Sequence, residues 1–289
     1  MNFIKSNKAL ILSILAMSFP AIIEMAMNTL LGIADTIMIS QLIGKDALAA
    51  SGFANQIMTT IILVFSSFNV GATVMISRRY GEKNIDMVNR VVGQNMSLNL
   101  IIGLAITILS VAFSNNLMYI FDTSPQVFDL GVSYLSVLSY SHLFMFIAFA
   151  VASSLRGVED TRTPMIITGI INVINLIGNY LLITGFWIFP EMGIRGAALS
   201  TTLSRLIGAV MYLFVLIRGN DYIKLKLSNL RISSDILAPL WKFSSNAGLE
   251  QFIMQGSFFV VGIIISLLDT TSEASYRVLM TIESISFMP

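Results

Sequence analysis

Seven long apolar runs constrain this 289-residue sequence more than any other feature. They lie near 9–39, 53–77, 91–113, 127–153, 164–186, 196–217 and 239–268, and an eighth begins near 274. A helix needs about 20 mostly apolar residues to cross the ~30 Å hydrocarbon core of a bilayer. Each of the seven runs is long enough. The sequence therefore predicts an all-α polytopic membrane protein, embedded in the lipid bilayer of the cell membrane.

The composition excludes several other classes of protein. Charged residues make up only 11% of the chain, and the mean hydropathy is +0.81, whereas soluble domains carry about 25% charged residues. The net charge of +1 comes from basic residues spread over short loops, which argues against a nucleic-acid partner. With no cysteine and one histidine, we expect no metal site built on these residues. No nucleophile–base pair or phosphate-binding loop is apparent, so we expect neither an enzyme nor a cofactor.

The distribution of Lys and Arg predicts the orientation in the membrane. Cytoplasmic loops of membrane proteins carry an excess of these residues. Of the 17 basic residues, those on one side of the alternating path are Lys5, Lys8, Arg78, Arg79, Lys83, Arg90, Arg156, Arg162, Arg218, Lys224, Lys226, Arg231 and Lys242. We therefore expect a cytoplasmic N-terminus, with the loops after the second, fourth and sixth runs on the same side.

A weak internal repeat suggests two related halves. Residues 20–24 resemble 246–250 at an offset of 226, and Ala-Ser at 50–51 matches Ala-Ser at 274–275 at an offset of 224. Chance similarity between apolar helices is the alternative. If the repeat is real, each unit has six helices and both share one orientation, as in parallel-repeat transporters. The second copy stops inside its second helix, so we expect a C-terminally truncated chain.

Four acidic residues lie inside the apolar runs: Glu24, Asp35, Glu250 and Glu283. A carboxylate in the bilayer costs at least ~2.5–3.5 kcal/mol and needs a partner, a hydrated cavity or a function. Glu24 and Asp35 are 11 residues apart, which brings them within ~20° on one helix face. With Asn28 they form an acidic stripe, with Asp35 toward the outer leaflet. Alternatively, Asp35 is an interfacial acid, Glu24 a partner between helices, and the other two are helix-packing acids.

The fifth run carries three asparagines, Asn172, Asn175 and Asn179, which the spacing i, i+3, i+7 places on one face. They serve either as ordinary interhelical hydrogen-bonding groups, which contribute about 0.6 kcal/mol each, or as a cavity wall that offers amide oxygens to a cation. Only Arg205 and Arg277 oppose the intramembrane acids, so the balance of charge favours a cationic ligand or coupling ion, H⁺ or Na⁺.

Several motifs resemble the multidrug and toxic compound extrusion (MATE) family. The matching segments are GIADTIMI at 32–39, LRGVEDTRTPM at 155–165, the asparagine face at 172–179 with PEMGIRGAA at 190–198, and IESISFMP at 282–289. The resemblance implies a fold of two six-helix lobes around a central cavity. This chain would supply the N-lobe (1–218), a cytoplasmic inter-lobe loop (219–235) and the first two helices of the C-lobe (236–289).

The resemblance also implies a function and a site. The family exports lipophilic or cationic small molecules in exchange for H⁺ or Na⁺, and we expect a monomer with no cofactor. Asp35 falls on its first-helix acid, with a Na⁺ site possible there, and Asn175 on a polar position of its fifth helix. Asn179 departs from one branch, which has aspartate there. In the NorM-type branch a seventh-helix glutamate binds the cation, and that register holds Gln255, with Glu250 five residues earlier.

From these residues we expect cation binding at Asp35 to bend the first helix at Pro20 or Gly32. Two other functions stay open. A flippase for lipid-linked precursors, from the same superfamily, should hold several Arg or Lys in its cavity to bind pyrophosphate, whereas this chain places carboxylates there. An inactive fragment or assembly subunit is the other alternative.

Overall fold

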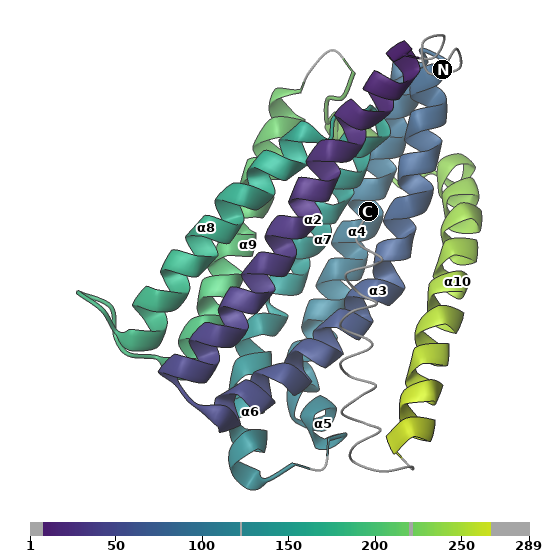
Figure 1. Cartoon of the computed structure of the whole chain (residues 1–289). Helices are drawn as coiled ribbons and strands as arrows, with labels where there is room; N and C mark the ends of the chain where they lie inside the picture. Colours follow the sequence, from purple (N-terminus) through teal and green to yellow (C-terminus); the bar gives the residue numbers. More distant parts are fainter. Residues whose placement is uncertain (1–7, 122, 220–221, 267–289) are drawn as a thin grey trace.

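The computed structural model describes residues 8–121, 123–219 and 222–266, and every regular element in them is a helix. The elements are α2 (Lys8–Leu42), α3 (Lys45–Gly81), α4 (Ile85–Ala112), α5 (Ser114–Tyr119), α6 (Pro125–Ser139), α7 (Ser141–Gly157), α8 (Arg162–Thr184), α9 (Gly193–Arg218), the 3₁₀ turn η1 (Leu227–Leu230) and α10 (Ser234–Ser266). The long helices lie side by side in one elongated bundle (Figure 1). The all-helical prediction is confirmed.

Each of the seven apolar runs is helical, with three differences in detail. Helix α3 begins at Lys45 rather than near 53. Lys45 and Asp46 are charged, so the apolar run starts later in the sequence, but Lys45, Asp46 and Ala47 are all compatible with a helix. The run 127–153 is two helices, α6 and α7, bent by 44°. The short helix α5 occupies a stretch expected to be a loop. The eighth run lies outside the described residues.

The described helices fit a multi-pass membrane protein. By length and composition, α4, α8, α9 and residues Ile14–Leu42 of α2 could each cross a bilayer, and the bent α6–α7 pair makes a fifth candidate. Helices α3 and α10 are 37 and 33 residues long. Over their described residues, they are not among these candidate spans. That these two helices also cross the bilayer stays a prediction.

Helices α4, α7, α9 and α8 pack each against the next in that order, whereas α2 and α10 lie at the edges. Helix α2 packs chiefly along α8, with light contact to α3 and α9, and only 6% of its apolar span is buried. Helix α10 packs along α3, on the other side of the bundle from α8 (Figure 1). The two edge helices therefore belong to different sides of the structure.

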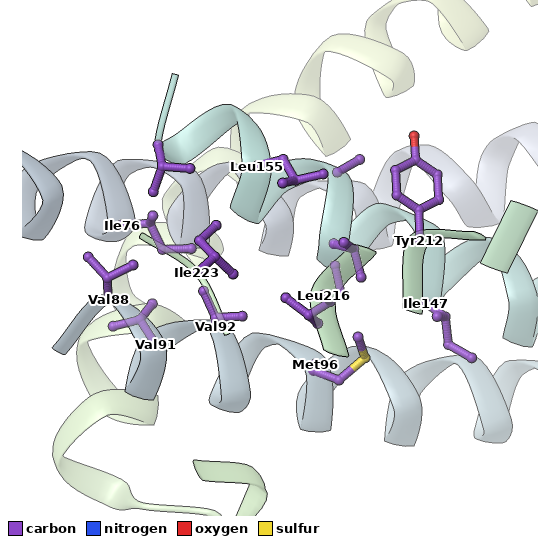
Figure 2. Packing of buried hydrophobic residues seen from close by; sticks show 14 of the residues in the cluster. Ile76, Val88, Val91, Val92, Met96, Ile147, Leu155, Tyr212, Leu216 and Ile223 are labelled. Atoms are coloured by element: carbon purple, nitrogen blue, oxygen red, sulfur yellow. The ribbon is translucent and has the colours of Figure 1, made fainter. Parts of the chain in front are cut away.

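The main apolar core lies between α4, α7 and α9 (Figure 2). Val88, Val91 and Leu155 are almost fully buried in it, together with Leu216 near the end of α9. Ile223, which follows α9, is 2% exposed and belongs to the same cluster. The segment after α9 is thus part of the packed structure.

Gln94 of α4 holds the connection between α9 and α10. Its Nε2 donates to the carbonyl oxygens of Asn229 at 2.9 Å and Arg231 at 2.6 Å, and its Oε1 accepts from the Ser233 backbone nitrogen at 2.9 Å. Next to it, a Cβ at position 93 would lie 2.4 Å from the Asn229 oxygen, so only glycine allows this approach. A single side chain thus satisfies three backbone groups of the connection.

We expect Gln94→Leu to release this connection, because three part-buried backbone groups lose their partner. Trypsin cleavage after Arg231 should accelerate by about tenfold, the change produced by losing roughly 1.4 kcal/mol of local hydrogen bonding. Limited proteolysis of the purified protein measures this rate. Gln126→Leu is the matched control, because Gln126 is exposed at the start of α6. Equal cleavage rates in both variants would contradict this role for Gln94.

Candidate functional site

The Asp35 carboxylate lies half-buried on α2 and is bound by two amides of α8. Asn179 Nδ2 donates to Asp35 Oδ1 at 2.6 Å. Asn175, with its amide oriented so that both nitrogen and oxygen have partners, donates to the same oxygen at 3.1 Å. Its oxygen then accepts from Thr201 Oγ1 of α9 at 3.1 Å. The structure therefore brings Asp35 together with two asparagines of the predicted face, Asn175 and Asn179.

Both amides are held by the close packing of α8 on α9. Asn175 and Asn179 are one helical turn apart and are 2% and 1% exposed. A Cβ at Gly178 would lie 2.5 Å from Ser200 Oγ, so glycine lets the two helices approach here. Ser200 Oγ also donates to the Asn175 carbonyl oxygen at 2.9 Å. The donors that face Asp35 are thus fixed before any ligand arrives.

One oxygen at this site has no donor. Asn179 Oδ1 is buried, and no hydrogen-bond partner for it is found within the described part of the chain. A buried polar atom without a partner costs roughly 1–3 kcal/mol unless something binds it. Amide and carboxylate oxygens are the ligands that hard cations prefer. Asp35 and Asn179 Oδ1 together therefore provide the chemistry to hold a proton or a small cation.

Other polar groups surround the carboxylate at longer range. Arg205 of α9 interacts electrostatically with Asp35 and with Tyr134 of α6. Arg205 Nη1 donates to Ser141 Oγ at 2.6 Å, so its guanidinium is tied to the start of α7. Within the described ranges there is no group of three or more His, Cys, Asp or Glu side chains that could hold a metal ion. The site thus has a single carboxylate with a cationic group nearby.

The second predicted acid, Glu24, also faces α8. Arg156 Nη1, from the end of α7, lies 3.3 Å from Glu24 Oε2, and Thr168 Oγ1 donates to Oε1 at 3.3 Å. Between the two acids, Asn172 Nδ2 donates to Asn28 Oδ1 at 3.5 Å. The α2 stripe and the α8 asparagine face therefore meet along their length. The interpretation of Glu24 as a partner between helices matches this geometry.

The two predicted hinge positions lie within one continuous helix. Pro20 is buried and α2 passes through it without a break. A Cβ at Gly32 would meet no atom within 4 Å, so space does not require glycine there. The proposed bending at these residues stays a prediction.

Glu250 is not brought to Asp35. It lies exposed on α10, beside a shallow hollow that Asn246, Leu249 and Met254 also line. Because α10 packs on α3 rather than on α2 or α8, this face is separate from the Asp35 site. The side chain of Gln255 and all of Glu283 and Arg277 lie outside the described residues. A role for Glu250 or Gln255 in cation coupling stays a prediction.

Two residues near Asp35, Thr201 and Tyr134, carry no sequence signal that predicts them as part of the site. Thr201 has no distinguishing sequence signal, because hydroxyls in apolar helices are common and often bond their own backbone. Tyr134 is 5% exposed on α6, and nothing in its local sequence marks it. Arg205 was recognised as an intramembrane cation, and that rarity was the available signal.

The family model MatE matches residues 20–181, which include Glu24, Asp35 and both asparagines that bind Asp35. The chain belongs to the MatE family. The match covers more than half of the sequence, and the motifs that suggested the resemblance at 32–39 and 155–165 lie inside it. Its members are transport proteins.

Similar relatives are described as a probable multidrug resistance protein and a multidrug export protein. The chain is 28% identical to "Probable multidrug resistance protein NorM" of Thermotoga maritima over 96% of its own length and 59% of the relative's. It is 22% identical to "Multidrug export protein MepA" of Staphylococcus aureus, over 90% of its length and 57% of the relative's. The chain therefore spans less than two thirds of these curated relatives.

Solved structures show the same fold. A MATE structure in the bent conformation superposes with a TM-score of 0.88 at 24% identity, over 96% of this chain and 61% of that one. An outward-facing structure of a multidrug resistance MATE transporter gives a TM-score of 0.85 at 23% identity, over 96% and 60%. The prediction of a MATE-like fold is confirmed.

Proposed function

We propose that this chain provides the cation-coupling lobe of a secondary-active efflux transporter, in which Asp35 binds the coupling ion. One observation carries the proposal. A single half-buried carboxylate accepts from two fixed amides, and one of these amides presents a buried oxygen for which the described residues offer no donor. A carboxylate inside the membrane beside an oxygen without a donor is a suitable place for a cation to bind.

Cation binding would change how α2 is held. The hydrogen bonds from Asn175 and Asn179 to an ionised carboxylate are charge-assisted and about twice as strong as neutral ones. A proton or Na⁺ at Asp35 neutralises the carboxylate and weakens both bonds. The part of α2 beyond Asn28 is then freed from α8, and the transporter changes conformation. Release of the ion restores the bonds and the original position.

The exported compounds would be lipophilic or cationic small molecules; the names of the relatives support drug-like compounds as cargo, and the carboxylate at the site favours cationic ones. The remaining features of the proposal are a cytoplasmic N-terminus, an N-lobe at 1–218, a loop at 219–235 and the start of a second lobe at 236–289. The loop docks on α4 through Gln94. A flippase for pyrophosphate-linked lipids is less suitable, because the centre of the site is a carboxylate and Arg205 is already bound to Ser141.

The test is efflux under separately imposed gradients. Membrane vesicles containing the protein that carries this chain are loaded with a fluorescent cationic dye, and a pH or a Na⁺ gradient is applied alone. We expect one gradient to drive dye movement and the other to have little effect. Dye movement that neither gradient changes would contradict cation coupling.

A further inference from the structure

The polar contacts between α2 and α8 keep one constant register. Glu24 contacts Thr168, Asn28 contacts Asn172 and Asp35 contacts Asn179, and each pair is 144 residues apart. A constant offset means that the two helices run parallel without slipping. Steps of four and seven residues keep the three contacts on one side of each helix. Together they form a polar seam of three rungs.

This seam carries most of the attachment of α2. Helix α2 packs chiefly on α8 and exposes apolar residues such as Leu30 and Ile37 over most of its surface. Because lipid tails are as apolar as these side chains, apolar contact alone provides little drive for association in a membrane. Small residues and polar rungs must supply it. Breaking one rung should therefore change the position of α2 measurably.

The three rungs respond differently to a bound cation. The Asp35 rung is a short hydrogen bond, 2.6 Å, whose strength depends on the charge of the carboxylate. The Asn28 rung is a 3.5 Å contact between neutral amides, and Asn28 is exposed. The Glu24 rung includes an ion pair with Arg156, a group that a ligand at Asp35 does not touch. Of the three contacts, therefore, only the one at Asp35 weakens when a cation binds there.

The Glu24 end is held by two helices. Arg156 comes from the last turn of α7 and Thr168 from α8. Glu24 is 13% exposed and Arg156 37%. The end of α7 is itself close against α3, since a Cβ at Gly157 would lie 2.7 Å from Ile76 Cγ2. Helix α2 is therefore attached here to the closely packed part of the bundle.

We propose that Glu24 and Arg156 are a positioning pair that anchors α2 on α7 and α8. The anchor holds the register in which Asp35 faces Asn179, and it makes cation binding release only the part of α2 beyond Asn28. Neither residue binds the coupling ion. The inference rests on the proposed function, because it assigns the anchor to the movement that Asp35 controls.

Cysteine cross-linking can follow both ends of the seam, because the chain has no native cysteine. Met38→Cys with Leu182→Cys reports on the Asp35 end, and Ala21→Cys with Met165→Cys on the Glu24 end. Both pairs keep the offset of 144 residues. The rate of cross-linking by a short bifunctional thiol reagent is measured in lipid nanodiscs at saturating and at low coupling cation, pH and Na⁺ being varied separately. All variants are compared as the full 289-residue chain.

We expect the cation to slow cross-linking at 38/182 by about threefold, the change from losing one average interhelical hydrogen bond. The rate at 21/165 should not respond. Glu24→Gln should slow cross-linking at 21/165 and abolish the cation effect at 38/182, and the charge swap Glu24→Arg with Arg156→Glu should restore both. Glu159→Gln, an exposed acid next to the same segment, is the control. Rescue by the swap is a result that general loss of folding would not produce.

Each contrary outcome identifies what has failed. A wild-type pattern at both pairs in Glu24→Gln overturns the anchor. If the cation effect at 38/182 is lost in Asp35→Asn but unchanged in Glu24→Gln, the anchor is wrong and the proposed function stands. If the effect persists in Asp35→Asn, Asp35 is not the cation site. If the cation does not change the cross-linking rate at 38/182 when Glu24, Arg156 and Asp35 are unmodified, both proposals are wrong.

Discussion

Replacing Asp35 by asparagine is expected to abolish gradient-driven efflux while leaving the protein in the membrane at normal levels. Asparagine has nearly the same shape as aspartate, but it does not take up a proton at any working pH and carries no charge to attract a cation. The variant therefore cannot alternate between the ionised form, which accepts two charge-assisted hydrogen bonds, and the neutral form that releases α2. The rate of coupled efflux should fall by about 100-fold. Dye efflux from vesicles with matched protein content measures it.

Asp129→Asn provides the matched control for this variant. Asp129 is an exposed acid on α6, outside the polar seam, and the same loss of one charge should leave efflux unchanged. A large loss in both variants would mean that efflux depends on total charge rather than on the Asp35 site. Normal efflux by Asp35→Asn would remove Asp35 from the mechanism.

Gly196→Ala is expected to have the largest effect on folding. A Cβ at this position would lie 2.4 Å from the carbonyl oxygen of Leu182 and 2.6 Å from its carbonyl carbon. These are backbone atoms of the last turn of α8, so no side chain can move aside. The same carbonyl accepts from the Met192 backbone nitrogen at 3.0 Å, which closes the connection between α8 and α9. Forcing the helices apart should cost about 2 kcal/mol or more.

The effect of Gly196→Ala can be measured as the fraction of monodisperse protein after detergent extraction and as the shift in Tm. We expect both to fall, because the α8–α9 pair carries Asn175, Asn179 and Thr201 and the whole site depends on it. Gly52→Ala is the control, since a Cβ there would meet no atom within 4 Å. Equal behaviour of the two variants would show that the close approach at Gly196 is not required.

Much of the fold follows from the sequence because the bilayer imposes simple rules. Length and hydropathy of the runs predict helices, since only a helix satisfies its own backbone in lipid. The spacing of Glu24 and Asp35 places them on one face of α2, and that of Asn172 and Asn179 does the same for α8. The polar side chains of either face would cost free energy if they faced lipid, so we expect the two faces to contact each other.

Other features depend on contacts that no local pattern reports. The bend between α6 and α7 leaves the apolar run unbroken, so hydropathy predicts one helix there. Gln94 looks like an ordinary polar residue on α4, yet it binds a segment more than 130 residues later in the chain. Tyr134 and Thr201 reach the Asp35 site only through the packing of α6 and α9. Glu250 looked equivalent to Glu24 by position, but α10 packs on a different helix.

Infrared difference spectroscopy of the purified chain in lipid tests the central claim most directly, because it observes the carboxyl group itself. The spectrum is recorded before and after a change in pH or Na⁺ concentration, for the unmodified chain and for Asp35→Asn. We predict a carboxyl or carboxylate band that responds to the coupling cation in the unmodified chain and disappears in Asp35→Asn. An identical cation-dependent band in both proteins would contradict the assignment of Asp35 as the coupling site.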